Sequence, residues 1–384
     1  HGEIDEERSV GFIELFYDLI FVVVIARAAH HLAEHLDWEG VFDFAVVFGM
    51  IWLAWLNGSF YQDLHGREDG RSRTYIFIQM GILAVLGVYT DGAAGEDGQG
   101  FALTYVVLLL LLTWMWYSVR RQDTEEYMDI TARYLAGMAV SLVVVLVSAF
   151  VDDGIRLGIW AVFVIGWVLG MIAIEDWREE LTMHPTDSTV ERFGLFTIIV
   201  LGEVVVGVVT GLSEAERDFR TIATGMLGMG IGFGFWWTYF DFVGRRFPRE
   251  RRYMRWTASH LPIVAAIAAA GAALVSLVEH AGDPSTSDNA AWVLSGSIAV
   301  ALLALIFTMT TLRDFDRLPT IYQPTVRSML AGVVVVLAVG WWRPAPWILA
   351  GTLFAVLSLV WWVAVYGWIS LDNPSEAQPN AEQA

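Results

Sequence analysis

Long apolar runs recur along the whole chain, and they constrain its fold more than any other feature. The first run, Val10 to Leu32, can cross a bilayer, because about 20 helical residues at 1.5 Å each span the roughly 30 Å hydrocarbon core. Only helices and closed barrels satisfy their backbone polar groups in lipid. The sequence therefore predicts an all-α, polytopic membrane bundle of about 12 transmembrane helices. The predicted spans are residues 11–34, 41–61, 74–91, 101–119, 131–151, 155–175, 192–212, 221–241, 257–279, 290–311, 326–342 and 345–369.

Composition agrees with a membrane bundle and excludes several kinds of chemistry. The 384 residues are 56% hydrophobic and only 17% charged, which is too little charge for a soluble domain of this size. The absence of Cys excludes disulfides and thiolate chemistry, and the absence of Lys excludes Schiff-base catalysis. The net charge of −19 argues against nucleic-acid binding. No nucleotide-binding motif occurs, so no cofactor is expected.

Arginine is distributed unevenly between the connections of the predicted spans. Most arginines fall in four connections, residues 62–73, 120–130, 244–256 and 312–325, which lie on one side of the membrane if the spans alternate. By the positive-inside rule, this side is cytoplasmic. We therefore expect a protein of the inner (plasma) membrane with both termini in the cytoplasm. The tail, residues 372–384, has no apolar periodicity and is expected to be disordered.

A seven-residue pattern occurs twice, and its two copies are 178 residues apart. The copies are Tyr61, Asp63, Gly66, Arg67, Arg71, Arg73 and Tyr75, then Tyr239, Asp241, Gly244, Arg245, Arg249, Arg251 and Tyr253. The pattern predicts two six-helix halves, residues 1–183 and 184–371. Because each half has an even number of spans, the two halves share one orientation, with a pseudo-twofold axis along the membrane normal. Chance matching between arginine-rich loops is the alternative.

The repeated pattern also predicts local structure at two helix ends. Gly66 and Gly244 suit the left-handed position that follows a helix, which Gly adopts without strain. Asp63 and Asp241 stand four residues before arginines, which favours ion pairs one helical turn apart. The neighbouring arginines would attract anionic lipid headgroups, or would serve as ordinary positive-inside anchors. Membrane lipids are therefore expected partners.

Charged residues occur where the first span would cross the membrane. Glu14 and Asp18 are one helical turn apart on one face, whereas Arg27 and His31 share another face. Each such group costs roughly 2.5–3.5 kcal/mol on insertion scales. This helix is therefore expected inside a bundle, with its charges directed to partners or to a water-filled cavity.

The first span of the second half carries a similar set. Arg192 and Glu203 are eleven residues apart and share nearly one helix face. Glu7-Arg8 before the first span matches Glu191-Arg192, and in that register Glu203 falls within about one residue of Asp18. Facing carboxylates would form a proton or cation site. Alternatively, these are structural groups, with Glu203 pairing to Arg192 or acting as a polar contact between helices. The candidate pathway residues are Glu14, Asp18, Arg27, His31, Glu191, Arg192 and Glu203.

Other residue patterns have simpler interpretations. His31 and His35 are the only histidines at the spacing of helical zinc motifs, and interfacial histidines are favoured over a metal site. Glycines crowd the eighth span in two small-xxx-small pairs, which favour close helix packing, with a broken helix as the alternative. The chain has 18 tryptophans, and Trp55 is one of them. Most lie near predicted span ends, where an aromatic belt is expected.

Two strings in the chain resemble those of one bacterial family. The first string lies between Glu7 and Leu32 and reads ERSVGFIELFYDLIFV, followed by HHL. The second runs from His184 to Glu203 and reads HPTDSTVERFGLFTIIVLGE. Both are similar to the low temperature requirement protein A family. The resemblance implies a multi-pass membrane protein and a cold-growth phenotype, but no established biochemical activity. A weaker similarity links FYDLIF to endolysosomal potassium channels with two six-helix repeats, although Tyr17-Asp18 stands where that family has Ser-Asp.

Two functions from different classes follow. The first is a secondary transporter or ion-conducting protein with a carboxylate-lined pathway for a proton or small cation. The second is a membrane-embedded enzyme acting on lipids, for which His184, Asp187 and Ser188 are the candidate residues, or a structural accessory factor. The first is favoured, so the protein is not expected to be an enzyme.

Overall fold

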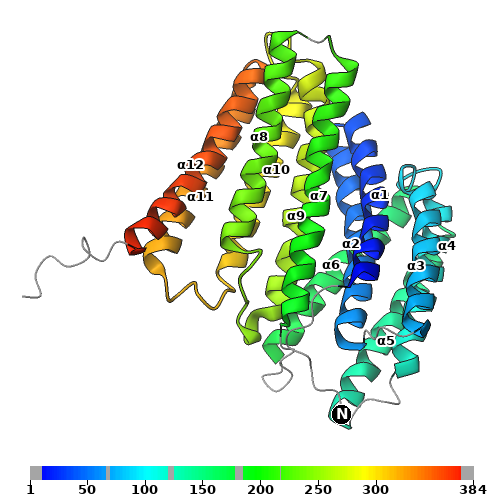
Figure 1. Ribbon diagram of the computed structural model, residues 1–384. Helices are drawn as coiled ribbons and strands as arrows, with labels where there is room; N and C mark the ends of the chain where they lie inside the picture. Colours follow the sequence, from blue (N-terminus) through cyan, green and yellow to red (C-terminus); the bar gives the residue numbers. More distant parts are fainter. Residues whose placement is uncertain (1–10, 66–69, 120–124, 178–184, 217, 373–384) are drawn as a thin grey trace, which may run out of the picture. The chain divides into compact units, whose positions relative to one another are not determined.

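The computed structural model describes residues 11–65, 70–119, 125–177, 185–216 and 218–372 (Figure 1). Within these ranges the chain forms twelve α-helices and one short 3-10 helix, and it contains no β-strand. The helices are α1 (Phe12–Glu34), α2 (Trp38–His65), α3 (Gly70–Thr90), α4 (Gly98–Val119), α5 (Glu125–Ser148), α6 (Asp153–Trp177), α7 (Asp187–Glu214), α8 (Phe219–Phe242), α9 (Tyr253–Glu279), α10 (Asp288–Met309), α11 (Pro319–Trp342) and α12 (Pro346–Asp372).

The predicted all-α, multi-pass architecture is confirmed. In the described ranges, every helix except α1 and α8 is long and apolar enough to cross a membrane, which gives ten candidate spans. The predicted tail, residues 372–384, begins at the last helical residue, and residues 373–384 lie outside the described part of the chain.

The structure also separates the helices at both short breaks that the sequence predicts. A turn divides α5 from α6 around residues 149–152. The helix α11 ends at Trp342, and Arg343 then adopts a left-handed conformation with φ 52°. Pro344 follows, and its ring fixes φ and offers no N–H, so the helix cannot continue through it.

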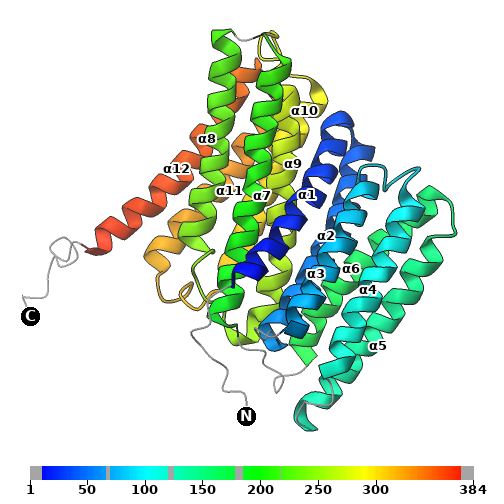
Figure 2. The same cartoon turned by 45° about the vertical axis from the view of Figure 1, so that its right-hand side comes forward.

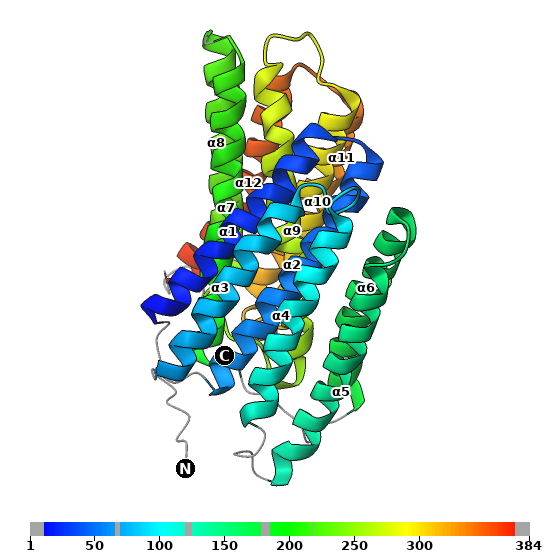
Figure 3. The same ribbon diagram turned by 90° about the vertical axis from the view of Figure 1, so that its right-hand side faces the viewer.

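The chain divides into two compact units, residues 1–200 and 201–384, and the boundary falls within α7. In the first unit, α1 packs against both α2 and α3, and α4 packs against α2, α3 and α5. The helix α6 packs against α2 and α5. Figure 2 shows α3 beside α4, and Figure 3 shows α5 beside α6.

In the second unit, the helices pack in a continuous series from α8 to α9, α10, α11 and α12, and α12 returns to α8. The helix α9 is rich in alanine, and the segment 263–274 is almost wholly buried, with only Ala265 partly exposed. Small side chains let neighbouring backbones approach closely. One such approach joins Gly271 to the backbone of Glu203, where an added Cβ would lie 2.6 Å from the carbonyl.

The glycines of α8 serve helix packing in this unit. An added Cβ at Gly228 would lie 2.9 Å from Val208, and one at Gly234 would lie 2.7 Å from Leu357. Gly232 and Gly230, which stand four residues from Gly228 and Gly234 in the two small-xxx-small pairs, are similarly crowded. The helix α8 is continuous from Phe219 to Phe242, so the packing interpretation holds and the broken-helix alternative does not.

Large apolar side chains are also exposed on the outer faces of several helices. Phe77 on α3, Val162 on α6 and Val334 on α11 are 75%, 72% and 68% exposed. Contiguous exposed apolar surface is unusual for a soluble protein and suits contact with lipid.

Candidate functional site

Arg192 on α7 contacts both carboxylates of α1 inside the first unit. Its guanidinium lies 3.7 Å from Glu14 and 3.5 Å from Asp18. The side chains are nearly inaccessible, with exposed fractions of 3% for Arg192, 5% for Glu14 and 0% for Asp18. The structure thus brings together three of the seven predicted pathway residues.

Trp55 on α2 completes this cluster from a third helix. Its indole N–H donates to Asp18 Oδ1 over 3.0 Å. The indole also stacks on Phe196 and meets Phe193 edge-on, with ring centroids 4.0 Å and 5.0 Å apart. Aromatic packing and the hydrogen bond together fix the orientation of the Asp18 carboxylate. Trp55 is fully buried, so it is not one of the tryptophans that could form an interfacial belt.

The three charged side chains give the cluster its chemistry. Two carboxylates share one guanidinium. Asp18 Oδ2 and Arg192 Nε are buried and have no hydrogen-bond partner among the described residues. A buried carboxylate is costly unless it is paired or protonated. The Asp18 oxygen that lacks a partner can therefore accept a proton.

The start of α7 is held by Asp63, which belongs to the repeated pattern. Thr186 caps α7, because its hydroxyl accepts the Thr189 backbone N–H over 3.0 Å. Both threonine hydroxyls donate to the Asp63 carboxylate, over 2.7 Å and 2.8 Å. This contact fixes the helix that carries Arg192 to the end of α2. The predicted ion pair of Asp63 with Arg67 and the predicted conformation of Gly66 lie outside the described residues.

The second copy of the pattern differs from the prediction. Asp241 accepts a hydrogen bond from the Trp361 indole over 2.7 Å, and no ion pair to Arg245 forms in the described structure. No described glycine has a positive φ, so the left-handed conformation predicted for Gly244 is wrong. An added Cβ at Gly244 would instead lie 2.7 Å from the Tyr239 ring. Gly is therefore required there by close packing, not by backbone conformation.

Tyr61 and Tyr239, which begin the two copies of the pattern, are both buried, and each contacts an aromatic ring. Tyr61 meets Trp116 edge-on in the first unit, with ring centroids 5.6 Å apart. The Tyr239 hydroxyl lies 3.1 Å from His260 Nε2 in the second unit. His260 is fully buried on α9, and the repeated pattern does not predict this contact.

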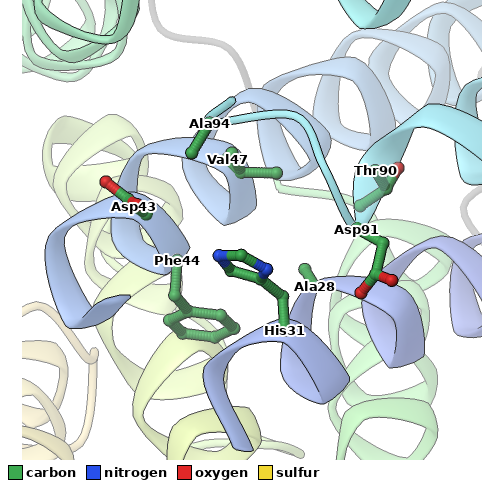
Figure 4. Close-up of a pocket in the computed structure, with 8 residues that line it drawn as sticks. All are labelled: Ala28, His31, Asp43, Phe44, Val47, Thr90, Asp91 and Ala94. Atoms are coloured by element: carbon green, nitrogen blue, oxygen red, sulfur yellow. The ribbon is translucent and has the colours of Figure 1, made fainter. Parts of the chain in front are cut away.

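Arg27 and His31 lie near the other end of α1. Arg27 donates to Asp91 over 2.9 Å, in a pair that is partly exposed. The His31 ring points into a small pocket between Asp43 and Asp91 (Figure 4), and it stacks on His35 with centroids 4.5 Å apart. In the described chain, no group of three His, Asp or Glu side chains has the geometry of a metal site.

Glu191 and Glu203 are the last two predicted pathway residues. Glu191 is exposed at the start of α7. Glu203 belongs to the second unit and is 5% exposed. The ion pairs of Arg192 are with Glu14 and Asp18, and not with Glu203 as the alternative interpretation expected.

Two of the three candidate residues of a lipid-acting enzyme lie within the described residues. His184 lies outside the described residues. Asp187 lies in the first turn of α7, and Ser188 is 7% exposed there.

Apolar helices with exposed apolar faces and a buried charged cluster define a multi-pass helical membrane protein. The family described as "Bacterial low temperature requirement A protein (LtrA)" matches residues 9–366, and the chain belongs to this family. An uncharacterized protein of Rhizobium meliloti (strain 1021) is 24% identical over 286 residues, which cover 68% of each chain. No solved structure matches the chain.

Proposed function

We propose that this protein moves a proton or small cation across the membrane, as a secondary transporter or ion-conducting protein. The buried cluster of Glu14, Asp18 and Arg192 carries the proposal. Ionisable groups inside a membrane are costly, and they are characteristic of ion and proton pathways. The buried Asp18 oxygen that lacks a described partner is the group that would take up the proton or cation.

The geometry of α1 supports a pathway along this helix. The cluster lies in its first half, and the pocket lined by His31 lies near its end. Between them, Phe21 and Val24 are buried on successive turns of the helix. In a conducting protein, apolar side chains between two polar sites can act as a gate. These side chains would then have to move for the ion to pass from the pocket to Asp18.

We further propose the two-repeat arrangement with both termini in the cytoplasm of the plasma membrane. The packing within each unit supports the repeat. Four contacts of the first unit, α3–α4, α4–α5, α5–α6 and α2–α6, have counterparts in the second, α9–α10, α10–α11, α11–α12 and α8–α12. When Glu7-Arg8 is aligned with Glu191-Arg192, Glu203 falls within about one residue of the counterpart of Asp18. Glu191 would then lie at the entrance of the equivalent helix.

The proposal is tested by flux into liposomes that contain the purified protein. The assay applies a proton gradient and a panel of monovalent cations. Asp18→Asn removes one charge at nearly constant size, and we expect it to lower flux to the level of protein-free liposomes. Asp316→Asn is the control, because Asp316 is an exposed partner of Arg249. Absence of flux with the unmodified protein, or equal flux from both variants, contradicts the proposal.

A further inference from the structure

Two connections of the second unit concentrate positive charge at one end of its helices. Residues 243–256 run from the end of α8 into α9, and residues 310–318 connect α10 to α11. Together they contain eight arginines and three acidic residues, a net charge of +5 in a chain whose net charge is −19. A local excess of positive charge on an acidic protein attracts anions to that surface.

Backbone hydrogen bonds join the two connections into one surface. The Arg249 N–H donates to the Thr311 carbonyl over 2.9 Å, and the Arg313 N–H donates to the Phe247 carbonyl over 3.1 Å. These bonds belong to an isolated antiparallel bridge between the connections. Arginines that are far apart in the chain are therefore held on the same part of the molecule.

Four of the arginines bind the opposite connection and stabilise this arrangement. The Arg249 guanidinium donates to the Leu312 carbonyl over 3.0 Å and to Asp316 over 2.6 Å. Three others also donate across the pair of connections, namely Arg246, Arg252 and Arg313. The guanidinium of Arg249, which the repeated pattern suggested as a contact for lipid, therefore binds the protein itself.

Arg245 and Arg317 differ from these four. Both side chains are exposed, and neither forms an ion pair or a hydrogen bond with the described residues. Both adjoin one ion pair, that of Arg246 with Asp314. Arg245 precedes Arg246 in the chain, and the Arg317 backbone N–H donates to the Asp314 carbonyl over 3.0 Å. A guanidinium without a partner presents a planar fork of N–H groups, which suits a phosphate.

The neighbouring part of α12 has the features of a membrane interface. The Arg246 guanidinium lies 4.9 Å from the centroid of the Trp368 ring. Tyr366 and Ile369 on the same stretch are 67% and 53% exposed. Tryptophan and tyrosine are enriched at the level of lipid headgroups. The connections also adjoin α9, α10 and α11, which are all candidate spans. Lipid phosphates are therefore the anions expected beside this surface.

We propose that Arg245 and Arg317 bind the phosphate groups of anionic phospholipids at the surface formed by residues 243–256 and 310–318. Basic clusters next to a membrane span attract anionic lipid, and each basic side chain contributes roughly fivefold in affinity. The inference does not depend on ion movement, because it concerns the other unit of the chain. Ordinary positive-inside anchoring depends on total charge, and not on these two positions.

The test measures the thermal unfolding midpoint of the purified full-length protein in detergent micelles at constant ionic strength. Three additions are compared, namely phosphatidylglycerol, zwitterionic phosphatidylcholine at the same mole fraction, and sodium phosphate. A ligand that binds only the folded state raises the midpoint as its concentration increases. We expect this rise with phosphatidylglycerol and not with the other two. The rise should decrease when NaCl is added, because salt screens exposed charges.

Two double variants with the same change in net charge test the positions. Arg245→Gln combined with Arg317→Gln is expected to require about 30-fold more phosphatidylglycerol for the same rise, and each single substitution about fivefold more. Arg133→Gln combined with Arg220→Gln is the matched control, because both arginines are exposed, on α5 and in the first turn of α8. Equal midpoints without added lipid show that the variants fold, and the single substitutions replace a double variant that does not.

Three results overturn the inference. An equal rise with phosphatidylcholine shows that the lipid phosphate is not recognised as part of an anion. An equal rise with sodium phosphate shows a site for free anions and not a lipid surface. An equal loss of response in the two double variants shows attraction by total charge, without a site at Arg245 and Arg317.

Discussion

Arg192 and Asp18 are 174 residues apart in the chain, yet their side chains lie 3.5 Å apart in the interior of the first unit. This contact joins the start of α7 to the first helix. The indole of Trp55 donates to the same carboxylate from α2. One buried carboxylate therefore connects three helices, and changes to it affect both packing and charge.

Removal of the Arg192 guanidinium is expected to be strongly destabilising. Arg192→Gln leaves Glu14 and Asp18 buried without their guanidinium, and breaking a buried pair in this way costs about 3–5 kcal/mol. Unfolding in detergent micelles measures the loss. Asp18→Asn in the same chain should restore part of it, with a coupling energy on the order of 1 kcal/mol or more. Strictly additive effects of the two substitutions would show that the groups do not interact.

The ion pair of Arg27 with Asp91 provides a contrast. Its side chains are 43% and 28% exposed, so water screens their attraction. Asp91→Asn is expected to change the free energy of unfolding by less than about 1 kcal/mol, and less still at high salt. A loss as large as that of Arg192→Gln in the same unfolding assay would be inconsistent with this exposure.

Hydrophobic periodicity predicted most of the fold, because a membrane span must be both long and apolar. The predicted and observed helices agree to within a few residues at most ends. The gaps predicted at residues 152–154 and 343–344 correspond to breaks that the structure places at 149–152 and 343–345. Arginine distribution predicted a topology, which depends on a membrane and stays a prediction.

Side-chain partners were harder to predict than helices. The charges of Glu14, Asp18 and Arg192 identified them as candidates, but their pairing depends on how α1 and α7 pack. The role of Trp55 was missed because a tryptophan in the middle of a helix looks the same whether it faces lipid or a carboxylate. Gly244 was misinterpreted because steric crowding and a left-handed backbone both require glycine.

Asp63 is expected to position α7. Asp63→Ala removes the acceptor of the Thr186 and Thr189 hydroxyls, so the start of α7 loses its connection to α2. We expect a loss of about 1–3 kcal/mol and faster proteolysis near residue 186. Thr189→Val removes one of the two bonds and should have a smaller effect. Equal proteolysis of Asp63→Ala and the unmodified protein would argue against this positioning role.

The contact of Gly271 with the Glu203 backbone should not tolerate a larger residue. An added Cβ would lie 2.6 Å from the Glu203 carbonyl, and the backbone can yield only by displacing a helix. Gly271→Ala is expected to cost about 1–3 kcal/mol. Gly296→Ala on α10 is the matched control, since nothing lies within 4 Å and alanine favours the helix. Equal unfolding midpoints for the two variants would show that α7 and α9 can separate without cost.

The predicted topology can be tested directly because the chain has no cysteine. Single cysteines are introduced at exposed positions and labelled with a membrane-impermeant maleimide. Asp283→Cys lies between α9 and α10, and Arg317→Cys lies between α10 and α11. Since arginine-rich connections stay in the cytoplasm, we expect Asp283→Cys to react in intact cells and Arg317→Cys to react only after permeabilisation.

A third cysteine tests the orientation of the two halves. Glu96→Cys lies between α3 and α4, at the position that corresponds to Asp283 if the halves are parallel repeats. Halves with an even number of spans share one orientation, so Glu96→Cys should react in intact cells as Asp283→Cys does. Labelling of these two cysteines from opposite sides would exclude the pseudo-twofold axis along the membrane normal. The proposed correspondence of Asp18 with Glu203 would then lose its basis, because the two carboxylates would no longer occupy equivalent positions in the membrane.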